Sequence, residues 1–219
     1  MRSLLKLSEL PSIIAAVLFW LFIPTASGAK PSVQEQQLDT LSFIEMINSV
    51  DLGQQSDFIQ QFQNKEARSK LLTKFNGKDG CTLENFRNKE VLLVTIPARL
   101  LFAPNETLLN DKASDYLAPF KRYLKQPDTY RVLLVMHTDN TGSERYRDDI
   151  TEERVESVFE WFEEQGCNTS FLFPYAMSDE MPIKPNDSQA NRDMNRRLEI
   201  YLMPGKKMLD QAEKGRIEF

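Results

Sequence analysis

The chain has 219 residues, of which 41% are hydrophobic and 27% charged, and its formal net charge at pH 7 is −5. This composition suits a folded protein with one good core and a small second unit, and it excludes a disordered chain. Because Lys and Arg are interspersed with acidic residues and form no basic stripe along the sequence, the composition also argues against a nucleic-acid partner.

The N-terminal segment predicts export. Arg2 and Lys6 precede an apolar run of eleven residues from Ile13 to Ile23, and small residues follow as far as Ala29. A membrane-spanning helix needs ~20 apolar residues, so we interpret residues 1–29 as a secretory signal peptide. An uncleaved inner-membrane signal anchor is the alternative.

Residues 30–89 are predicted to be a helical N-terminal region of unknown role. Four apolar residues approach helical spacing near its start, namely Leu41, Ile44, Ile47 and Val50. A second amphipathic pattern begins at Ser56 and runs toward a stop at Gly77. The simplest interpretation is a pair of helices that pack on the following domain or on each other, with a dedicated binding domain as the alternative.

Residues 90–204 alternate between strand and helix patterns. Val91–Ile96 is predicted to be the first strand, and Asn110 caps a helix that Pro119 should kink or split. Residues 130–136 contain an unbroken apolar run that is typical of a strand buried on both faces. The order predicted from these patterns is βαβαβ, which is an α/β arrangement.

The C-terminal part of this region supplies two further strands. Residues 171–176 are predicted to form a strand at an edge or a bulge, because Pro174 cannot donate a ladder hydrogen bond. After a short helical excursion at residues 187–192, alternation from Arg197 to Leu202 predicts a last strand with one buried and one solvated face. Residues 205–219 are dense in charge and are expected to be a solvated, charged C-terminal tail.

A candidate site follows the strand at residues 130–136. The sequence HTDNTG places Asp139 just past the strand, and Thr151 is predicted to cap a helix that ends near Gly166. Arg154 would lie in the first turn of that helix, where a cation is disfavoured by roughly 0.3–1 kcal/mol unless an anion compensates. Asp139, Arg154 and free helix N–H groups could together hold a zwitterionic amino-acid head. A structural Asp139–Arg154 ion pair explains the same pattern.

Three motifs at these spacings carry a family resemblance: HTDNTG at residues 137–142, Thr151 three positions before Arg154, and NRR at residues 195–197. They resemble the OmpA-like C-terminal domain shared by OmpA, Pal and MotB, which binds peptidoglycan. The resemblance covers residues 90–204. It implies an α+β sandwich that has a mixed sheet with helices on one side, no cofactor and no enzymatic activity.

The resemblance also implies roles for individual residues. In the family, the aspartate of HTD binds the ammonium of the diaminopimelate side chain in the peptidoglycan stem peptide, and the helix arginine binds its carboxylate. These roles carry over to Asp139 and Arg154. The other expected ligand-binding residues are Thr141, Asn105, Arg147 and Arg196. The implied location is the periplasm, at the cell wall or the outer membrane, with other envelope proteins as further candidate partners.

The chain departs from the family pattern at the edge of this site. Met136 stands where a glycine usually precedes HTD, and Arg147 stands where an asparagine normally lines the pocket. Residues 176–180 lack the usual glycines. An alternative function is therefore an exported module that keeps the fold and contacts a protein partner through the rim around Arg147 and Met177.

Two remaining features bear on chemistry. His137 is the only histidine and could act as a base with Asp139, but no nucleophile motif, metal-ligand cluster or glycine-rich loop accompanies it in the sequence, so we interpret it as structural. Cys81 and Cys167 are the only cysteines. Export to an oxidising compartment makes a disulfide between them one of two alternatives, and two free thiols are the other.

Overall fold

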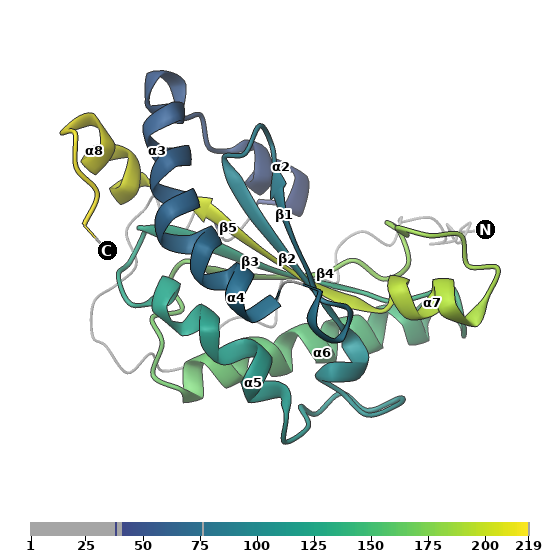
Figure 1. Ribbon diagram of the computed structural model, residues 1–219. Helices are drawn as coiled ribbons and strands as arrows, with labels where there is room; N and C mark the ends of the chain where they lie inside the picture. Colours follow the sequence, from purple (N-terminus) through teal and green to yellow (C-terminus); the bar gives the residue numbers. More distant parts are fainter. Residues whose placement is uncertain (1–37, 39–40, 76, 219) are drawn as a thin grey trace, which may run out of the picture.

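The computed structural model describes residues 38, 41–75 and 77–218, so the predicted signal peptide lies outside the described residues. Its centre is a five-stranded sheet in the order β1-β2-β5-β3-β4 (Figure 1). The strands are β1 (Thr82–Phe86), β2 (Val91–Pro97), β3 (Tyr130–His137), β4 (Leu172–Ala176) and β5 (Arg197–Pro204). β3 and β4 are parallel, whereas the other neighbours are antiparallel. The predicted mixed sheet is confirmed.

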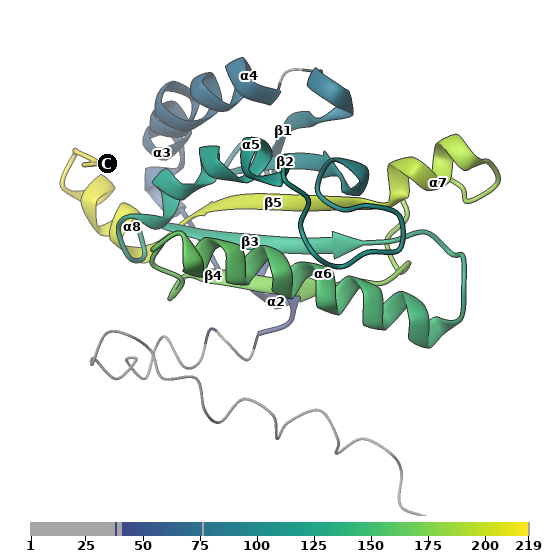
Figure 2. The same cartoon turned by 90° about the horizontal axis from the view of Figure 1, so that it is seen from below.

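Helices surround this sheet. They are α2 (Phe43–Asn48), α3 (Ser56–Gln63), α4 (Ser69–Phe75), α5 (Ala113–Leu117), α6 (Glu144–Glu164), α7 (Gln189–Asn195) and α8 (Lys206–Glu213). Short 3₁₀ segments are η1 (Gly53–Gln55), η3 (Lys78–Gly80), η4 (Ala98–Leu100) and η5 (Ala118–Leu124), and η2 (Asn64–Arg68) is a π-helical turn between α3 and α4. Figure 2 shows α5 and α6 in front of the sheet and α2 behind it.

The main core lies between the sheet and the helices in front of it. Val155, Val158 and Phe162 of α6 are buried against β3 and β4, at the helical spacing that the sequence shows. On the opposite face, the ring of Phe43 in α2 lies 5.4 Å from that of Tyr201 and 5.7 Å from that of Tyr175. Both faces of the central strands are therefore covered. No helix in the described part of the chain has the length and apolar character needed to cross a membrane.

The N-terminal region contains the two predicted helices and one strand. The pattern that starts at Ser56 forms α3, η2 and α4, and α2 forms near the first pattern. β1, however, occupies residues that were expected to be helical, and that expectation is wrong for Thr82–Phe86. The residues between β1 and β2 include three consecutive positive φ values, at Arg87, Asn88 and Lys89, which close an antiparallel hairpin. β1 forms because it pairs with β2. Local periodicity in the sequence does not show this pairing.

Prolines act as predicted. α5 ends at Leu117, and the chain continues as the 3₁₀ segment η5 with Pro119 in its first turn, so the predicted split is confirmed. β4, which contains Pro174, is an edge strand of the sheet.

Two expectations about exposure are wrong. In β5, the side predicted to be solvated is buried. Arg197 and Tyr201 each donate a hydrogen bond to Glu199, and Phe43 of α2 packs against the Tyr201 ring. The C-terminal segment is not fully solvated, because residues 206–213 form α8 and its Met208 and Ala212 are buried. α8 packs beside α3 (Figure 1).

Cys81 and Cys167 are both free thiols in the structure, which contradicts the disulfide alternative. Cys81 immediately precedes β1, whose first residue pairs with Thr95 near the carboxyl end of β2. Cys167 follows α6, and its neighbour Asn168 donates to the carbonyl of Leu124, in the segment that precedes β3. The two thiols are thus separated along the length of the sheet.

Candidate functional site

Asp139 lies two residues beyond β3 and is 1% exposed. Its Oδ1 accepts hydrogen bonds from the backbone N–H of Thr141 at 2.7 Å and from the Thr141 hydroxyl, and its Oδ2 pairs with the guanidinium of Arg196. Burial alone would raise the pKa of Asp139, but the bonds from Thr141 and Arg196 outweigh it and hold the pKa below its ordinary value. The structure therefore brings together three of the predicted residues, with Thr141 and Arg196 bound to the ionised carboxylate of Asp139.

Arg154 is a buried cation that is 5% exposed. Its Nε donates to the carbonyl oxygen of Glu106 at 2.9 Å, and its Cζ lies 4.8 Å from the centre of the Phe102 ring. Burial lowers the pKa of this guanidinium, and the charge on Arg196 lowers it further. Within the described residues no carboxylate lies within 4.0 Å of Arg154, so its charge is balanced only by carbonyl dipoles and a ring. The alternative of a structural Asp139–Arg154 ion pair is not found.

The helix that carries Arg154 begins earlier than predicted. α6 starts at Glu144, and its N-cap is Ser143, whose hydroxyl accepts the backbone N–H of Tyr146 at 3.2 Å. The hydroxyl of Thr151 donates within the helix, to the carbonyls of Arg147 and Asp148. Arg154 is therefore in the third turn, about 15 Å along the axis from the free N–H groups of the helix start. Helix N–H groups cannot join Arg154 in holding one small ligand, and that part of the sequence-based site is wrong.

Arg147 pairs with Asp179, a partner that the sequence did not predict. Its Nε donates to Oδ1 of Asp179 at 2.8 Å, and one terminal nitrogen donates to the carbonyl of Gly142 at 2.8 Å. It does not pair with Asp139, whose cationic partner is Arg196. The altered rim residue therefore ties the start of α6 to the segment after β4.

Asn105 lies in the loop that also binds Arg154. Its backbone has a positive φ of 61°, and its side-chain oxygen accepts a hydrogen bond from the Tyr146 hydroxyl at 3.1 Å. Since Glu106 and Ala103 supply the carbonyls for Arg154, the loop of residues 103–106 connects the first turn of α6 to its third. Asn105 thus lies at the edge of the Arg154 environment, and its predicted role in ligand binding stays a prediction.

Several residues at this site were not found from the sequence. Phe102, Glu106 and Tyr146 surround Arg154, and Asp193 pairs with Arg196 from α7. The contact of Arg154 with Glu106 uses a backbone carbonyl, which every residue has, so no pattern of side chains in the sequence could predict it. The spacing of Asp193 three residues before Arg196 was the one signal in the sequence, but the helix predicted at residues 187–192 stopped short of both.

A buried polar cluster adjoins the site through His137. The imidazole is 2% exposed, and its Nε2 lies 3.3 Å from Oε2 of Glu199. Glu199 also accepts from Nε of Arg197 at 2.7 Å and from the Tyr201 hydroxyl at 2.6 Å. In the described part of the chain, no group of three His, Cys, Asp or Glu side chains is arranged to hold a metal ion.

Comparison with known sequences and structures agrees with this fold and this order of motifs. The sequence model of the OmpA family matches residues 101–196, the part of the chain that contains every predicted site residue. This part of the chain is an OmpA-like domain.

Among curated proteins, the chain is similar to the outer-membrane lipoprotein YfiB of Pseudomonas aeruginosa, with 33% identity over 105 residues that cover 48% of this chain and 62% of the relative. It is 28% identical to the peptidoglycan-associated lipoprotein of Legionella pneumophila over 46% of this chain and 57% of that relative. The chain thus spans less than two thirds of either protein. Among solved structures, a MotB-like protein from Desulfovibrio vulgaris matches with a TM-score of 0.59 and 25% identity, over 68% of this chain and 95% of that one.

Proposed function

We propose that this protein is exported to the periplasm and binds peptidoglycan noncovalently, through the diaminopimelate side chain of the stem peptide. The observation that carries the proposal is the buried guanidinium of Arg154, which has carbonyl acceptors but no carboxylate among its described neighbours. A buried cation without a counter-charge is costly, and a ligand carboxylate that reaches it would form a charge-assisted, two-pronged pair.

Asp139 supplies the complementary charge. An ionised carboxylate accepts about four hydrogen bonds, and three donors already reach Asp139, two from Thr141 and one from Arg196. One acceptor position is left for an ammonium group. A zwitterionic amino-acid head would then place its ammonium on Asp139, beside Arg196, and its carboxylate on Arg154, whose charge would gain the counter-charge that it lacks.

The remaining predicted residues have supporting roles in this proposal. Thr141 and Arg196 hold the Asp139 carboxylate in one orientation. Asn105 positions the loop that binds Arg154, and Arg147 fixes the rim through Asp179. The likeness to a relative named for its association with peptidoglycan supports the same reading. The proposed role is binding, with no covalent step.

Co-sedimentation with diaminopimelate-type sacculi tests the proposal. Wild-type protein should pellet with the sacculi, and Asp139→Ala and Arg154→Ala should each weaken binding by about 2–5 kcal/mol, because each leaves the opposite ligand charge unpaired. Arg145→Ala is the matched control, since that arginine lies on the same helix with a side chain that is 90% exposed. Thermal unfolding of each variant separates lost binding from lost folding. Wild-type protein that remains in the supernatant at low and moderate salt would reject the proposal.

A second candidate function is a contact with an envelope protein at the same rim. The specific observation is a set of exposed apolar side chains on and before α7, namely Met181, Ile183 and Met194. Asn195 accepts the backbone N–H of Ile183, and Arg197 donates to the carbonyl of Met181, so this segment is fixed next to Arg196. A partner that covered it would contact the segment that carries Arg196, the cationic partner of Asp139.

A further inference from the structure

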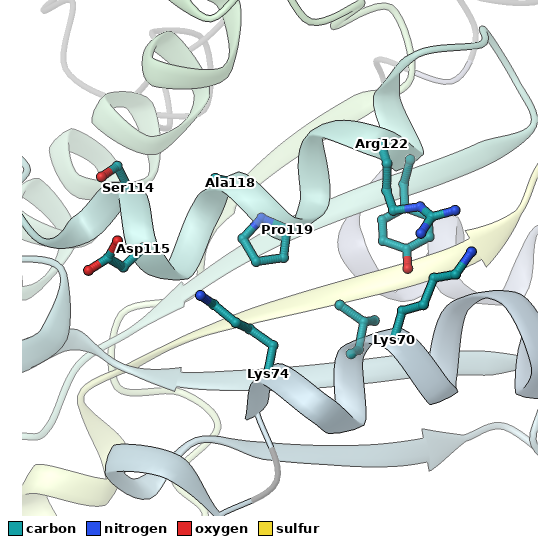
Figure 3. Close-up of a pocket in the computed structure, with 9 residues that line it drawn as sticks. Lys70, Lys74, Ser114, Asp115, Ala118, Pro119 and Arg122 are labelled. Carbon is teal, nitrogen blue, oxygen red and sulfur yellow. The ribbon is translucent and has the colours of Figure 1, made fainter.

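A groove of about 480 Å³ lies between α4 and the α5–η5 segment, on a part of the molecule that the peptidoglycan proposal does not use (Figure 3). One wall belongs to the N-terminal region and the other to the OmpA-like domain. The lining residues are Lys70, Leu71, Lys74, Ser114, Asp115, Ala118, Pro119, Arg122 and Tyr123. Because α4 lies outside residues 101–196, this groove is a feature of the whole chain rather than of the matched domain.

The rim of the groove is cationic. Figure 3 shows Lys70 and Lys74 reaching from α4 toward the opposite wall, where Arg122 lies. Lys70 pairs with Glu66 at 2.8 Å in an exposed i,i+4 contact, which is weak. Lys74 has no hydrogen-bond or ion-pair partner among the residues that the structure describes. Asp115 is the one carboxylate in the lining.

The floor of the groove is apolar. Leu71 and Tyr123 are each 1% exposed, and Pro119 and Ala118 line the wall beside them. The guanidinium of Arg122 lies 5.5 Å from the centre of the Tyr123 ring, so this cation rests on the floor. A ligand in the groove would therefore meet donors at the rim and an apolar surface beneath.

The two segments that form the walls carry an excess of positive charge in an acidic protein. Residues 64–78 contain five basic residues and one acidic residue, and residues 112–125 contain four basic residues and one acidic residue. The chain as a whole has a net charge of −5. Glu66, which lies beside Lys70 and Arg122, and Asp115 in the lining offset part of this charge. The basic residues still outnumber them, and an anion placed between the walls would balance the remainder.

We propose that this groove binds a phosphate-bearing group, either as a free phosphate compound or as the headgroup of an anionic phospholipid. A phosphate suits the site because its several acceptor oxygens can meet donors on both walls at once, Lys70 and Lys74 from α4 and Arg122 from η5. The apolar floor accommodates the carbon groups attached to the phosphate. This binding is independent of the Asp139 and Arg154 site.

The test compares matched charge reversals in the full chain. Lys74→Glu changes a groove residue, and Lys65→Glu makes the same charge change on the same helical run at a residue outside the lining. Binding is measured by calorimetric titration with inorganic pyrophosphate. It is also measured by sedimentation with vesicles of equal phosphatidylglycerol and phosphatidylcholine, and of phosphatidylcholine alone. The N-terminal segment is the same in all variants, so differences between them report on the groove.

We expect Lys74→Glu to weaken binding about tenfold and Lys65→Glu to change it less than threefold. Binding of pyrophosphate with this pattern identifies free phosphate compounds as sufficient ligands, and binding only to the anionic vesicles identifies a lipid headgroup. Equal weakening by both variants would mean that attraction is diffuse, and the proposed site would be wrong. Failure of wild-type protein to bind either probe above its binding to neutral vesicles would also overturn it. Sacculus binding by Lys74→Glu should equal that of wild type, which keeps this test separate from that of the proposed function.

Discussion

His137 and Glu199 form a buried pair in which Nε2 lies 3.3 Å from Oε2. Burial raises the pKa of Glu199, but contacts from His137, Arg197 and Tyr201 outweigh it and bring the pKa down to about 2. Arg197 already neutralises this carboxylate at 2.7 Å, and burial lowers the pKa of His137. We therefore infer that His137 is a neutral imidazole beside the ionised carboxylate of Glu199, because a second buried cation next to Arg197 would leave an unbalanced positive charge.

The first prediction is that acid destabilises the fold in two steps. The folded pKa of His137 is below its ordinary 6.5, so the unfolded chain takes up this proton first and stability falls as the pH drops below about 6.5. Glu199 has a folded pKa of about 2 against an ordinary 4.5, so its contribution, on the order of 3 kcal/mol, is present above 4.5 and is lost as the pH falls toward 2.

Urea unfolding at pH 7.5, 5.5 and 4 measures this dependence. Since His137 is the only histidine in the chain, His137→Gln should remove most of the loss between pH 7 and 5.5 while leaving the loss below 4.5. A wild-type free energy of unfolding that stays constant from pH 7.5 to 5.5 would contradict the predicted state of His137.

The second prediction concerns the two thiols. Cys81 is 1% exposed, and burial raises its pKa to about 11, so it should react very slowly with a disulfide reagent in the native protein. Cys167 is only half-buried and should react first. Without reductant, the urea-unfolded protein should titrate two thiols, and Cys167→Ser should titrate one. Finding no free thiol in unfolded, unreduced wild type would instead show a disulfide.

The third prediction distinguishes the two candidate functions through Arg147. Its guanidinium binds Asp179 and the carbonyl of Gly142 and leaves Asp139 to Arg196, so it does not block the site. Arg147→Asn should therefore leave sacculus binding unchanged or reduced, with a stability cost of about 1 kcal/mol for the lost ion pair. A gain of tenfold or more in sacculus binding would mean that the natural residue blocks the pocket, and the protein-contact function would then be preferred.

The fourth prediction is that a positive charge alone does not replace Arg154. Lysine keeps the charge but lacks the planar fork that can contact the Glu106 carbonyl, the Phe102 ring and a ligand carboxylate together. Arg154→Lys should weaken sacculus binding roughly tenfold, whereas Arg145→Lys on the exposed side of α6 should not. If Arg154→Lys binds as well as wild type, bidentate recognition by this arginine is wrong.

The fifth prediction tests the docking of α8. A Cβ atom at Gly205 would lie 2.2 Å from the carbonyl oxygen of Asp128, and this backbone contact cannot rotate away. Gly205→Ala should reduce the free energy of unfolding by about 1–3 kcal/mol. The measurement is chemical denaturation, with hydrogen exchange at residues 206–213 to detect release of α8. An unchanged midpoint together with protected α8 amides would show that the segment is placed differently.

Residue patterns in the sequence were enough to predict the elements that local interactions stabilise or that are deeply buried. The apolar run before His137 predicted β3, the spacing of Val155, Val158 and Phe162 predicted the buried face of α6, and Pro119 predicted where a helix stops. The start of α6 was missed because Thr151 resembles an N-cap as well as Ser143 does. Only the hydrogen bond actually formed by Ser143 distinguishes them.

The sequence by itself thus determined the family resemblance and the mixed α+β architecture, and it selected Asp139 and Arg154 as candidate site residues, because all of these depend on residue types at fixed spacings along the chain. The tertiary structure alone decided which charges meet. It paired Asp139 with Arg196, Arg147 with Asp179 and Arg154 with backbone carbonyls, across separations of 57, 32 and 48 residues. It also formed β1 by pairing with β2 and set α4 opposite η5 to make a cationic groove. Contacts between distant segments depend on how all the elements pack, and no local pattern records that.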